Sequence, residues 1–321
     1  MKLATLRDGT KDGRLHIVSR DLTRCAPSTT AQTLLDGLEN WDAMVAGLTA
    51  EYDELNNGGG NPFDQSEAMA PLPRAWQWLD ASAYMSHSTL MDAAFGFAEK
   101  EHPDFPLMYQ GMSNQFFGPT EDIPFGDEND GIDFEAEFGV ITTKVPFGAD
   151  AGTCAEHIRL IVQINDWSLR RLAPVEMKTG FGWIRAKPAC AMAPVAITPD
   201  ELGAHWRDQR VDLPLHVTWN DQKWGAASGY EMGFGFDELV ANAAYSRSLP
   251  AGTVVGGGTV SNPNYREVGS SCIAERRGIE MLDTGSAQTE FMRFGDSVKM
   301  EVFMNDGSPV FGTLKQHAVK A

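Results

Sequence analysis

The chain has 321 residues, of which 42% are hydrophobic and 22% charged, and its 32 glycines and 17 prolines predict a strand-rich fold with many turns. Its formal net charge of −18 argues against non-specific binding to nucleic acid or to an anionic membrane, because both depend on basic surface patches. The first residues contain no signal-like apolar run, and no stretch approaches the length of a membrane span. We therefore expect a soluble cytoplasmic protein whose four cysteines are reduced.

Residues 1–70 are predicted to form a small leading unit of mixed α/β character. Short apolar runs at 3–6 and 15–18 flank a turn-rich segment, as in a β-hairpin. Residues 31–55 carry apolar side chains at three- and four-residue spacings and predict a helix. The Gly-rich segment 56–62 ends this helix, and without a following Lys-Ser/Thr pair it favours a linker over a phosphate-binding loop.

From about residue 71 the sequence changes to segments rich in proline, aromatic residues and glycine, and we expect the main domain to span 71–321. Near its start, Asp80 and His87 place a carboxylate and an imidazole seven residues apart. Taken alone, such a pair is more often structural than catalytic.

The segment 131–140 is predicted to form one β-strand with acidic residues on one face. Apolar and acidic positions alternate along it, the acids being Asp133, Glu135 and Glu137. A solvated outer face would explain this pattern. A Glu-x-Glu pair aimed at one hard cation would explain it equally, since Mg²⁺, Mn²⁺ and Ca²⁺ prefer oxygen ligands.

Three later segments supply further polar groups. Asp166 follows an apolar strand-like run, where a carboxylate is well placed to face a site built on a sheet. Lys187 lies in a loop that begins at about residue 179. The Gly-rich turn before Thr259 would suit either a close approach to a ligand or a tight turn between strands.

Together these segments resemble the fumarylacetoacetate hydrolase family over about residues 70–315. The resemblance rests on the order and spacing of four motifs, namely Asp-Phe-Glu-Ala-Glu at 133–137, Asn-Asp-Trp-Ser-Leu-Arg at 165–170, the Lys187 loop, and Gly-Gly-Thr-Val-Ser at 257–261. It implies an α+β, mainly β fold, a mixed-sheet roll preceded by the small N-terminal unit. It also implies a homodimer.

The resemblance also assigns roles to individual residues. It implies one divalent cation, Mg²⁺ with Mn²⁺ or Ca²⁺ as alternatives, held by Glu135, Glu137, Asp166 and, at the spacing of true fumarylacetoacetases, Asp80. His87 would be the catalytic base, Glu275 the acid that orients it, and Lys187 a cation beside the metal. The residues that would contact substrate are Tyr109, Arg170 and Thr259.

The expected activity is metal-dependent hydrolysis of a carbon–carbon bond in a β-diketone or acylpyruvate. Decarboxylation of an oxaloacetate-like acid and isomerisation or hydration of a 2-oxo acid are the alternatives on the same site, and a non-catalytic binding protein is a third. The presence of both His87 and Glu275 favours hydrolysis, because activation of water needs a base. Ala173 and Met177 stand where the fumarylacetoacetate enzyme has polar residues, and the leading unit is shorter, so the substrate stays open.

Overall fold

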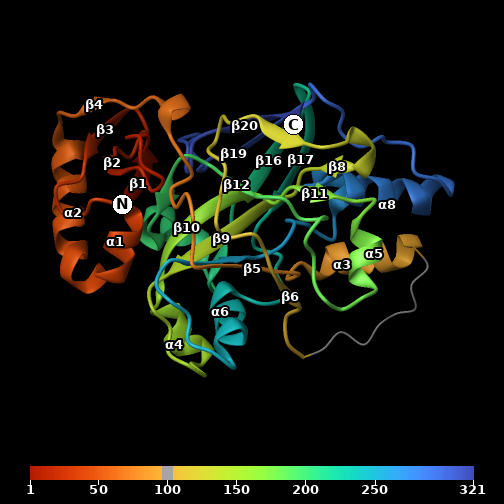
Figure 1. The fold of residues 1–321 in the computed structure, drawn as a ribbon, viewed down its shortest axis with the longest axis horizontal. Helices are drawn as coiled ribbons and strands as arrows, with labels where there is room; N and C mark the ends of the chain where they lie inside the picture. Colours follow the sequence, from red (N-terminus) through yellow and green to blue (C-terminus); the bar gives the residue numbers. More distant parts are fainter. Residues whose placement is uncertain (96–103) are drawn as a thin grey trace.

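The structure, a computed structural model, describes residues 1–95 and 104–321. Its strands form mixed sheets, and its helices lie along the faces and edges of these sheets (Figure 1). The predicted α+β class with a largely β core is confirmed. Among the described residues, no helix is both long enough and apolar enough to cross a membrane.

The largest sheet has 11 strands and carries the site described below. Neighbouring strands in it are antiparallel, except that β18 runs parallel to β5. Ten of its strands follow one another, and β12 (Ala191–Met192) pairs with β10 beside them. The order is β4 (Asn61–Pro62), β3 (Arg24–Pro27), β2 (Arg14–Val18), β1 (Lys2–Leu6), β13 (Ala196–Ile197), β10 (Ile158–Asn165), β9 (Ala136–Thr142), β18 (Thr253–Gly256), β5 (Gln77–Ala81) and β6 (Met108–Gln110).

A second sheet has five strands, in the order β17 (Gln222–Ser228), β16 (Pro214–Trp219), β19 (Ser297–Val302), β20 (Leu314–Lys320) and β7 (Ile123–Phe125). Two short pairs complete the strands, β8 (Ile132–Asp133) with β11 (Ser168–Leu169), and β14 (Trp206–Arg207) with β15 (Arg210–Val211).

The described helices are α1 (Leu34–Glu39), α2 (Trp41–Asn57), α3 (Met85–Phe95), α4 (Ala151–Ala155), α5 (Ala173–Met177), α6 (Phe236–Ala244), α7 (Tyr265–Val268) and α8 (Ile273–Thr284). Short 3₁₀ segments cover Gln65–Glu67, Glu128–Asp130 and Pro199–His205. Helices α3 and α8 lie side by side (Figure 1). They approach closely because Gly278 has no side chain, and a Cβ there would lie 3.3 Å from the Met91 sulfur.

The leading unit forms the predicted hairpin, in which β1 pairs with β2 in antiparallel register. The predicted single helix is wrong in one respect, because the chain breaks it at Asn40 into α1 and α2.

The predicted linker is also corrected. The Gly-rich segment turns at Gly58, whose φ is 143°, and returns as β4 to pair with β3 of the same unit. Since β1 also pairs with β13, the strands of this unit continue the large sheet.

The acidic segment differs from the predicted single strand. It forms two strands, β8 and β9, which are separated at Phe134 and Glu135. Strand β9 lies between β10 and β18, and residues from its two faces, such as Phe138 and Ile141, belong to two different apolar clusters. A solvated acidic face is therefore excluded, and all three carboxylates of this segment are buried.

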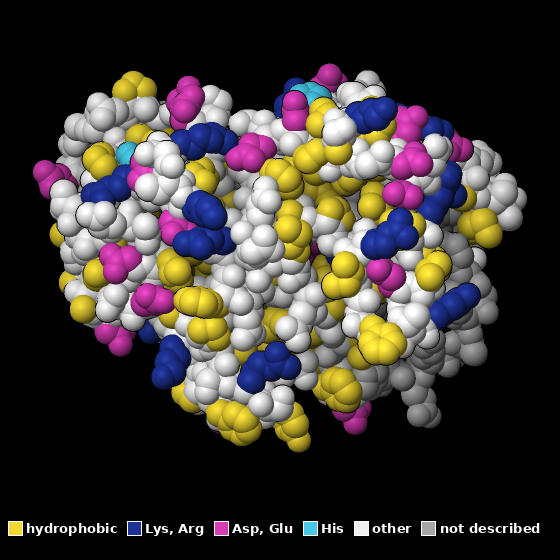
Figure 2. Space-filling model, in the orientation of Figure 1, with side chains coloured by type: hydrophobic (Ala, Val, Ile, Leu, Met, Phe, Trp, Pro, Cys, Tyr) yellow, Lys and Arg dark blue, Asp and Glu magenta, His cyan; other side chains and the backbone are white. Residues whose placement is uncertain are grey.

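On the face of the molecule shown in Figure 2, basic and acidic side chains are interspersed rather than gathered by sign, and hydrophobic side chains border its hollowed middle.

Candidate active site

Sheet pairing brings three carboxylates from distant parts of the chain together. Asp80 on β5 is in register with Gly256 of β18, which is in register with Gly139 of β9. On the other side of β9, Glu137 is in register with Ile164 of β10, and Asp166 follows at the end of that strand. The site is thus held by neighbouring strands of a rigid sheet rather than by loops alone.

Asp80, Glu137 and Asp166 form a compact, buried cluster. One carboxylate oxygen from each lies within 4.8 Å of the others. Their side chains are at most 4% exposed. Burial, together with the neighbouring acids, raises the pKa of Asp80 and of Glu137 well above the usual values, because burial in a group of like charges disfavours ionisation.

The cluster meets the requirements of a divalent cation. Both carboxylate oxygens of Glu137 are buried and have no hydrogen-bond partner among the described residues, although such groups are normally paired. A cation among the three carboxylates would satisfy these oxygens and offset the mutual repulsion. An all-oxygen donor set is the set that Mg²⁺ and Mn²⁺ prefer.

Glu135, the other predicted ligand of the Glu-x-Glu pair, is in a different environment. It accepts hydrogen bonds from Ser168 Oγ at 2.5 Å and Lys187 Nζ at 2.8 Å, and also from the Thr259 hydroxyl, while the Arg170 guanidinium lies 2.9 Å away. Burial opposes its ionisation, but Arg170 and Lys187 outweigh burial and hold the pKa of Glu135 below its usual value. Its oxygens are already satisfied, which sets it apart from Glu137.

Lys187 connects Glu135 with the carboxylate cluster. Its ammonium group donates to Glu135 and to Asp166, and it lies 5.4 Å from the centre of the Tyr109 ring and 5.3 Å from that of Trp183. Burial alone would lower its pKa, but Asp166 and Glu135 outweigh burial and raise the pKa of Lys187 above its usual value. Lys187 is therefore a fixed positive charge beside the carboxylate cluster.

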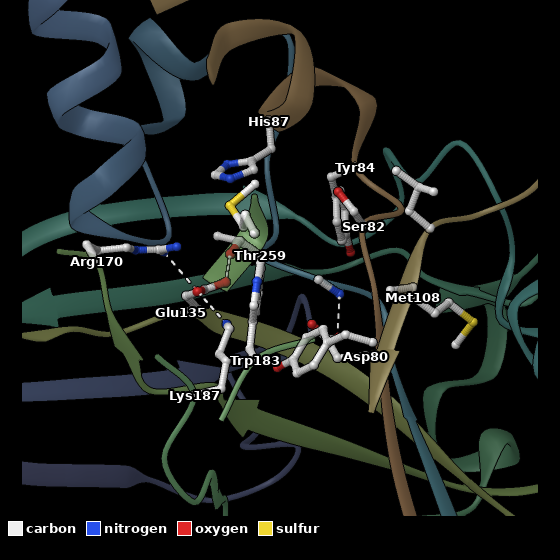
Figure 3. Close-up of a pocket in the computed structure, with 15 residues that line it drawn as sticks. Asp80, Ser82, Tyr84, His87, Met108, Glu135, Arg170, Trp183, Lys187 and Thr259 are labelled. Carbon is white, nitrogen blue, oxygen red and sulfur yellow. Dashed lines mark hydrogen bonds and ion pairs between the residues drawn. The ribbon is translucent and has the colours of Figure 1, made fainter. Parts of the chain in front are cut away.

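His87 projects from the first turn of α3 towards Thr259 and Glu135 (Figure 3). A ring nitrogen of His87 and a carboxylate oxygen of Glu275 lie within 4.8 Å of each other. Burial lowers the pKa of His87 to about 4 and raises that of Glu275 to about 7. The imidazole is therefore neutral at neutral pH, as a base must be before it accepts a proton.

A cavity with a volume of about 300 Å³ joins these groups. Asp80, His87, Glu135, Lys187 and Thr259 all line it, and Figure 3 shows them converging from different elements. Its remaining wall is largely apolar and includes Leu107, Met108, Met177 and Trp183. The structure therefore brings every predicted site residue into or beside one cavity.

Some contacts of the site could not be foreseen from motifs. The predicted substrate residue Tyr109 donates its hydroxyl to Asp166 Oδ2 at 2.7 Å. The Cys190 thiol lies 2.9 Å from the other oxygen of Asp166, and Ser261 donates to Glu275 at 2.5 Å. Cys190 was not singled out in the sequence, whereas Tyr109 and Ser261 were, but the partners of all three lie in other segments of the chain and follow only from the fold.

Asp133, to which the family resemblance assigns no role in the site, has a structural role. It accepts from Arg170 Nε at 2.8 Å and from the backbone N–H groups of Ile273 and Ala274 at 2.7 and 2.9 Å. It therefore holds Arg170 in place and satisfies free N–H groups at the start of α8, where a negative charge also suits the helix dipole.

Replacing Asp133 by alanine should destabilise the protein by about 3–5 kcal/mol, because it leaves the partly buried Arg170 short of a partner and removes two buried helix-terminal hydrogen bonds. Urea unfolding measures this loss. The exposed Asp122 provides a matched control, and its replacement by alanine should change stability by no more than about 0.5 kcal/mol. Equal effects of the two substitutions would contradict the role of Asp133.

Comparison with known proteins agrees with this arrangement. The family model described as fumarylacetoacetate (FAA) hydrolase C-terminal matches residues 77–319, and that of fumarylacetoacetase N-terminal domain 2 matches residues 1–74. No curated protein matches the sequence.

Several solved structures share the fold over the whole chain. Maleylpyruvate hydrolase from Sphingobium sp. SYK-6, in complex with manganese(II) and pyruvate, aligns at 14% identity and a TM-score of 0.67, covering 100% of both chains. The 5-carboxymethyl-2-hydroxymuconate delta-isomerase from Mycobacterium smegmatis aligns at 16% identity and a TM-score of 0.62, covering 100% of this chain and 99% of that chain. The 2-hydroxyhepta-2,4-diene-1,7-dioate isomerase from Mycobacterium marinum aligns at 16% identity and a TM-score of 0.61, covering 100% of this chain and 98% of that chain. At such identities the likeness shows the fold. Since the C-terminal family model spans most of the chain, the protein belongs to the fumarylacetoacetate hydrolase family.

Proposed function

We propose that this protein is a metal-dependent hydrolase that cleaves a carbon–carbon bond in a β-diketone or acylpyruvate. One observation carries the proposal. The carboxylate cluster, in which both oxygens of Glu137 lack partners, lies beside a cavity that also receives the neutral imidazole of His87. A cation site and a base next to the same cavity are the two components that hydrolysis of a dicarbonyl compound requires.

Asp80, Glu137 and Asp166 would hold the cation, Mg²⁺ or Mn²⁺, and Glu135 would lie next to it. When bound, the cation supplies Lewis acidity, which stabilises negative charge on the oxygens of a dicarbonyl substrate. The likeness to a maleylpyruvate hydrolase solved with manganese supports a divalent cation in this fold.

The reaction needs a water molecule whose proton is removed as its oxygen attacks a carbonyl carbon. His87 would accept that proton on a ring nitrogen. The bond between the attacked carbon and its neighbour then breaks, and its electron pair passes to the departing fragment as an enolate, which takes up a proton to become the ketone. The ammonium group of Lys187 would offset the negative charge that develops during these steps.

Glu275 would orient His87 and stabilise the imidazolium that forms, as a carboxylate partner does in other His-based sites. Its carboxylate lies close to the imidazole, and Ser261 occupies one of its two oxygens. The other oxygen is buried and has no partner among the described residues, so it is available to the ring.

Activity should depend on the ionisation of Glu275. Because burial raises its pKa to about 7, the carboxylate is charged above that pH and protonated below it. We therefore expect kcat/KM to fall as the pH drops below about 7. His87, with a pKa of about 4, stays neutral over that range and does not produce the fall. In the Glu275→Gln variant this fall of kcat/KM at acid pH should disappear, and kcat/KM should be low at every pH. If kcat/KM of this variant still fell below about pH 7, Glu275 would be ruled out as the cause of the fall.

The direct test is a screen of acylpyruvates and fumaryl diketones with Mg²⁺ or Mn²⁺, in which the ultraviolet absorbance of the diketone is followed. Loss of absorbance that stops with EDTA and returns with added metal is expected. If no diketone is consumed under any metal condition, the proposal fails.

Isomerisation of an unsaturated 2-oxo acid is the second candidate, because two of the similar folds belong to enzymes named as isomerases. Decarboxylation of an oxaloacetate-like acid would use the same cation. Product analysis separates the three activities. Hydrolysis releases two fragments, isomerisation keeps the mass of the substrate, and decarboxylation releases carbon dioxide. The homodimer and the cytoplasmic location stay predictions, and sedimentation equilibrium would test the first.

A further inference from the structure

A second cluster of potential metal ligands lies behind the cavity, between α3 and α8. It consists of His87, Cys272 and Glu275, and one donor atom from each lies within 4.8 Å of the others. The cluster is separate from the oxygen-rich group formed by Asp80, Glu137 and Asp166, with which it shares no residue.

Two atoms in this cluster are buried and unpaired. Nδ1 of His87 and Oε2 of Glu275 have no hydrogen-bond partner among the described residues. Glu275 is fully buried, so its free oxygen cannot be satisfied by bulk water. Buried polar atoms without partners are rare in proteins, and a missing ligand is one of their recognised explanations.

The third member, Cys272, is fully buried and caps α8. Its sulfur accepts from the backbone N–H of Glu275 at 3.3 Å. A serine at this position would preserve the cap, since serine is a preferred capping residue. The cap therefore does not explain why this position holds a cysteine. A different reason is needed for a thiol next to an imidazole and a carboxylate.

We propose that His87, Cys272 and Glu275 form an inhibitory binding site for a thiophilic divalent cation such as Zn²⁺. A thiolate, an imidazole and a carboxylate are the donors that Zn²⁺ takes, and three protein ligands leave its fourth position open. Mg²⁺ and Mn²⁺ favour oxygen donors and would select the other cluster instead. Binding would displace the thiol proton of Cys272 to solvent, since the thiolate is the form that binds metal.

Occupation of this site would inhibit the enzyme, because a neutral imidazole that binds a cation through one ring nitrogen carries its proton on the other nitrogen and cannot accept a proton from water. This consequence rests on the proposed function, whereas binding itself does not. Inhibition should persist at saturating Mg²⁺, because the two cations would occupy different clusters.

Binding is tested without substrate by titrating metal-free protein with Co²⁺, whose thiolate complexes show a charge-transfer band in the near ultraviolet. The wild-type protein should show this band, and Cys272→Ser should lose it, with Co²⁺ affinity at this site reduced at least about tenfold. Cys190→Ser is the matched control. Its thiol lies beside Asp166 of the oxygen-rich cluster, so this variant should keep the band.

Two outcomes would overturn the binding proposal, namely no thiolate band in the wild-type protein, or a band that depends on Cys190 instead. X-ray absorption spectroscopy of the zinc-loaded wild-type protein needs no variant, and one sulfur together with nitrogen and oxygen neighbours is expected. A zinc coordination shell without a sulfur neighbour would also refute the binding proposal.

The inhibitory role is tested by turnover with excess Mg²⁺. Added Zn²⁺ should lower wild-type turnover at least about tenfold and have little effect on Cys272→Ser. A thiolate band without inhibition would refute the inhibitory role while leaving the metal site established. Protein that shows the band but hydrolyses no diketone would contradict the proposed function and leave the binding site intact.

Discussion

Replacing His87 by alanine should lower kcat on an acylpyruvate by about 10²–10⁴-fold, the usual contribution of a general base. The substitution removes the only imidazole among the described residues that line the cavity. It leaves the three carboxylates in place, so Mg²⁺ or Mn²⁺ affinity should be unchanged. Steady-state kinetics and calorimetric metal titration measure the two effects separately.

His317 offers a matched control for the loss of an imidazole, since it is 45% exposed and pairs with Asp122 at the surface. His317→Ala should retain wild-type kcat. If His87→Ala also retained wild-type kcat, hydrolysis through this base would be excluded. If it lost metal as well as activity, its role would be structural.

The substitution Glu137→Gln should have two opposite effects. It should weaken metal binding at least about tenfold, because it removes a charged ligand from a set of three. In the absence of metal it should stabilise the folded protein at pH 7, because it removes a buried carboxyl group that must either ionise among like charges or take up a proton on folding. Calorimetric metal titration and urea unfolding in EDTA measure the two effects.

The pH dependence of that second effect follows from the direction of the pKa shift. The pKa of Glu137 is raised in the folded state, so its contribution to stability is fully present below its ordinary value of 4.5 and is lost as the pH rises through the raised value. The wild-type protein without metal therefore loses this contribution at high pH, whereas the variant has no carboxyl group to ionise. The stability advantage of the variant should grow with pH.

Glu135→Gln is the matched control and should have the opposite sign. The pKa of Glu135 is lowered by Arg170 and Lys187 despite its burial, so its contribution is present above its ordinary value of 4.5 and lost as the pH falls through the lowered value. Its replacement should destabilise the metal-free protein at pH 7, since the buried Lys187 and the partly buried Arg170 both lose a charged partner. Stabilisation by both substitutions, or by neither, would contradict the distinction between the two glutamates.

That distinction marks the limit of the sequence analysis. The alternation of residues 133–137 left a solvated face and a cation site equally open, and the cation site was predicted by the family resemblance that these residues, Asp166 and Lys187 carry. The pattern could not separate Glu137, with two free oxygens, from Glu135, which four neighbours satisfy. Those neighbours come from three other segments of the chain, and only tertiary pairing places them.

The structural role of Asp133, a residue that the prediction leaves outside the cation site, could not be predicted from the sequence for a similar reason. On an ideal strand it shares a face with the two glutamates. In the structure, the chain leaves β8 at this residue, and the side chain turns to Arg170 and to the start of α8, which lies 140 residues later. The break between α1 and α2 at Asn40 is another local event that the apolar periodicity alone did not resolve.

The most direct measurement follows the oxygen of water into the product. An acylpyruvate is incubated with the protein and Mg²⁺ or Mn²⁺ in water enriched in heavy oxygen, and the products are weighed by mass spectrometry. Hydrolysis through His87 predicts pyruvate and a carboxylic acid that carries one labelled oxygen, and neither product forms with His87→Ala or with EDTA. A product of unchanged mass, or cleavage without label in the acid, would contradict the account.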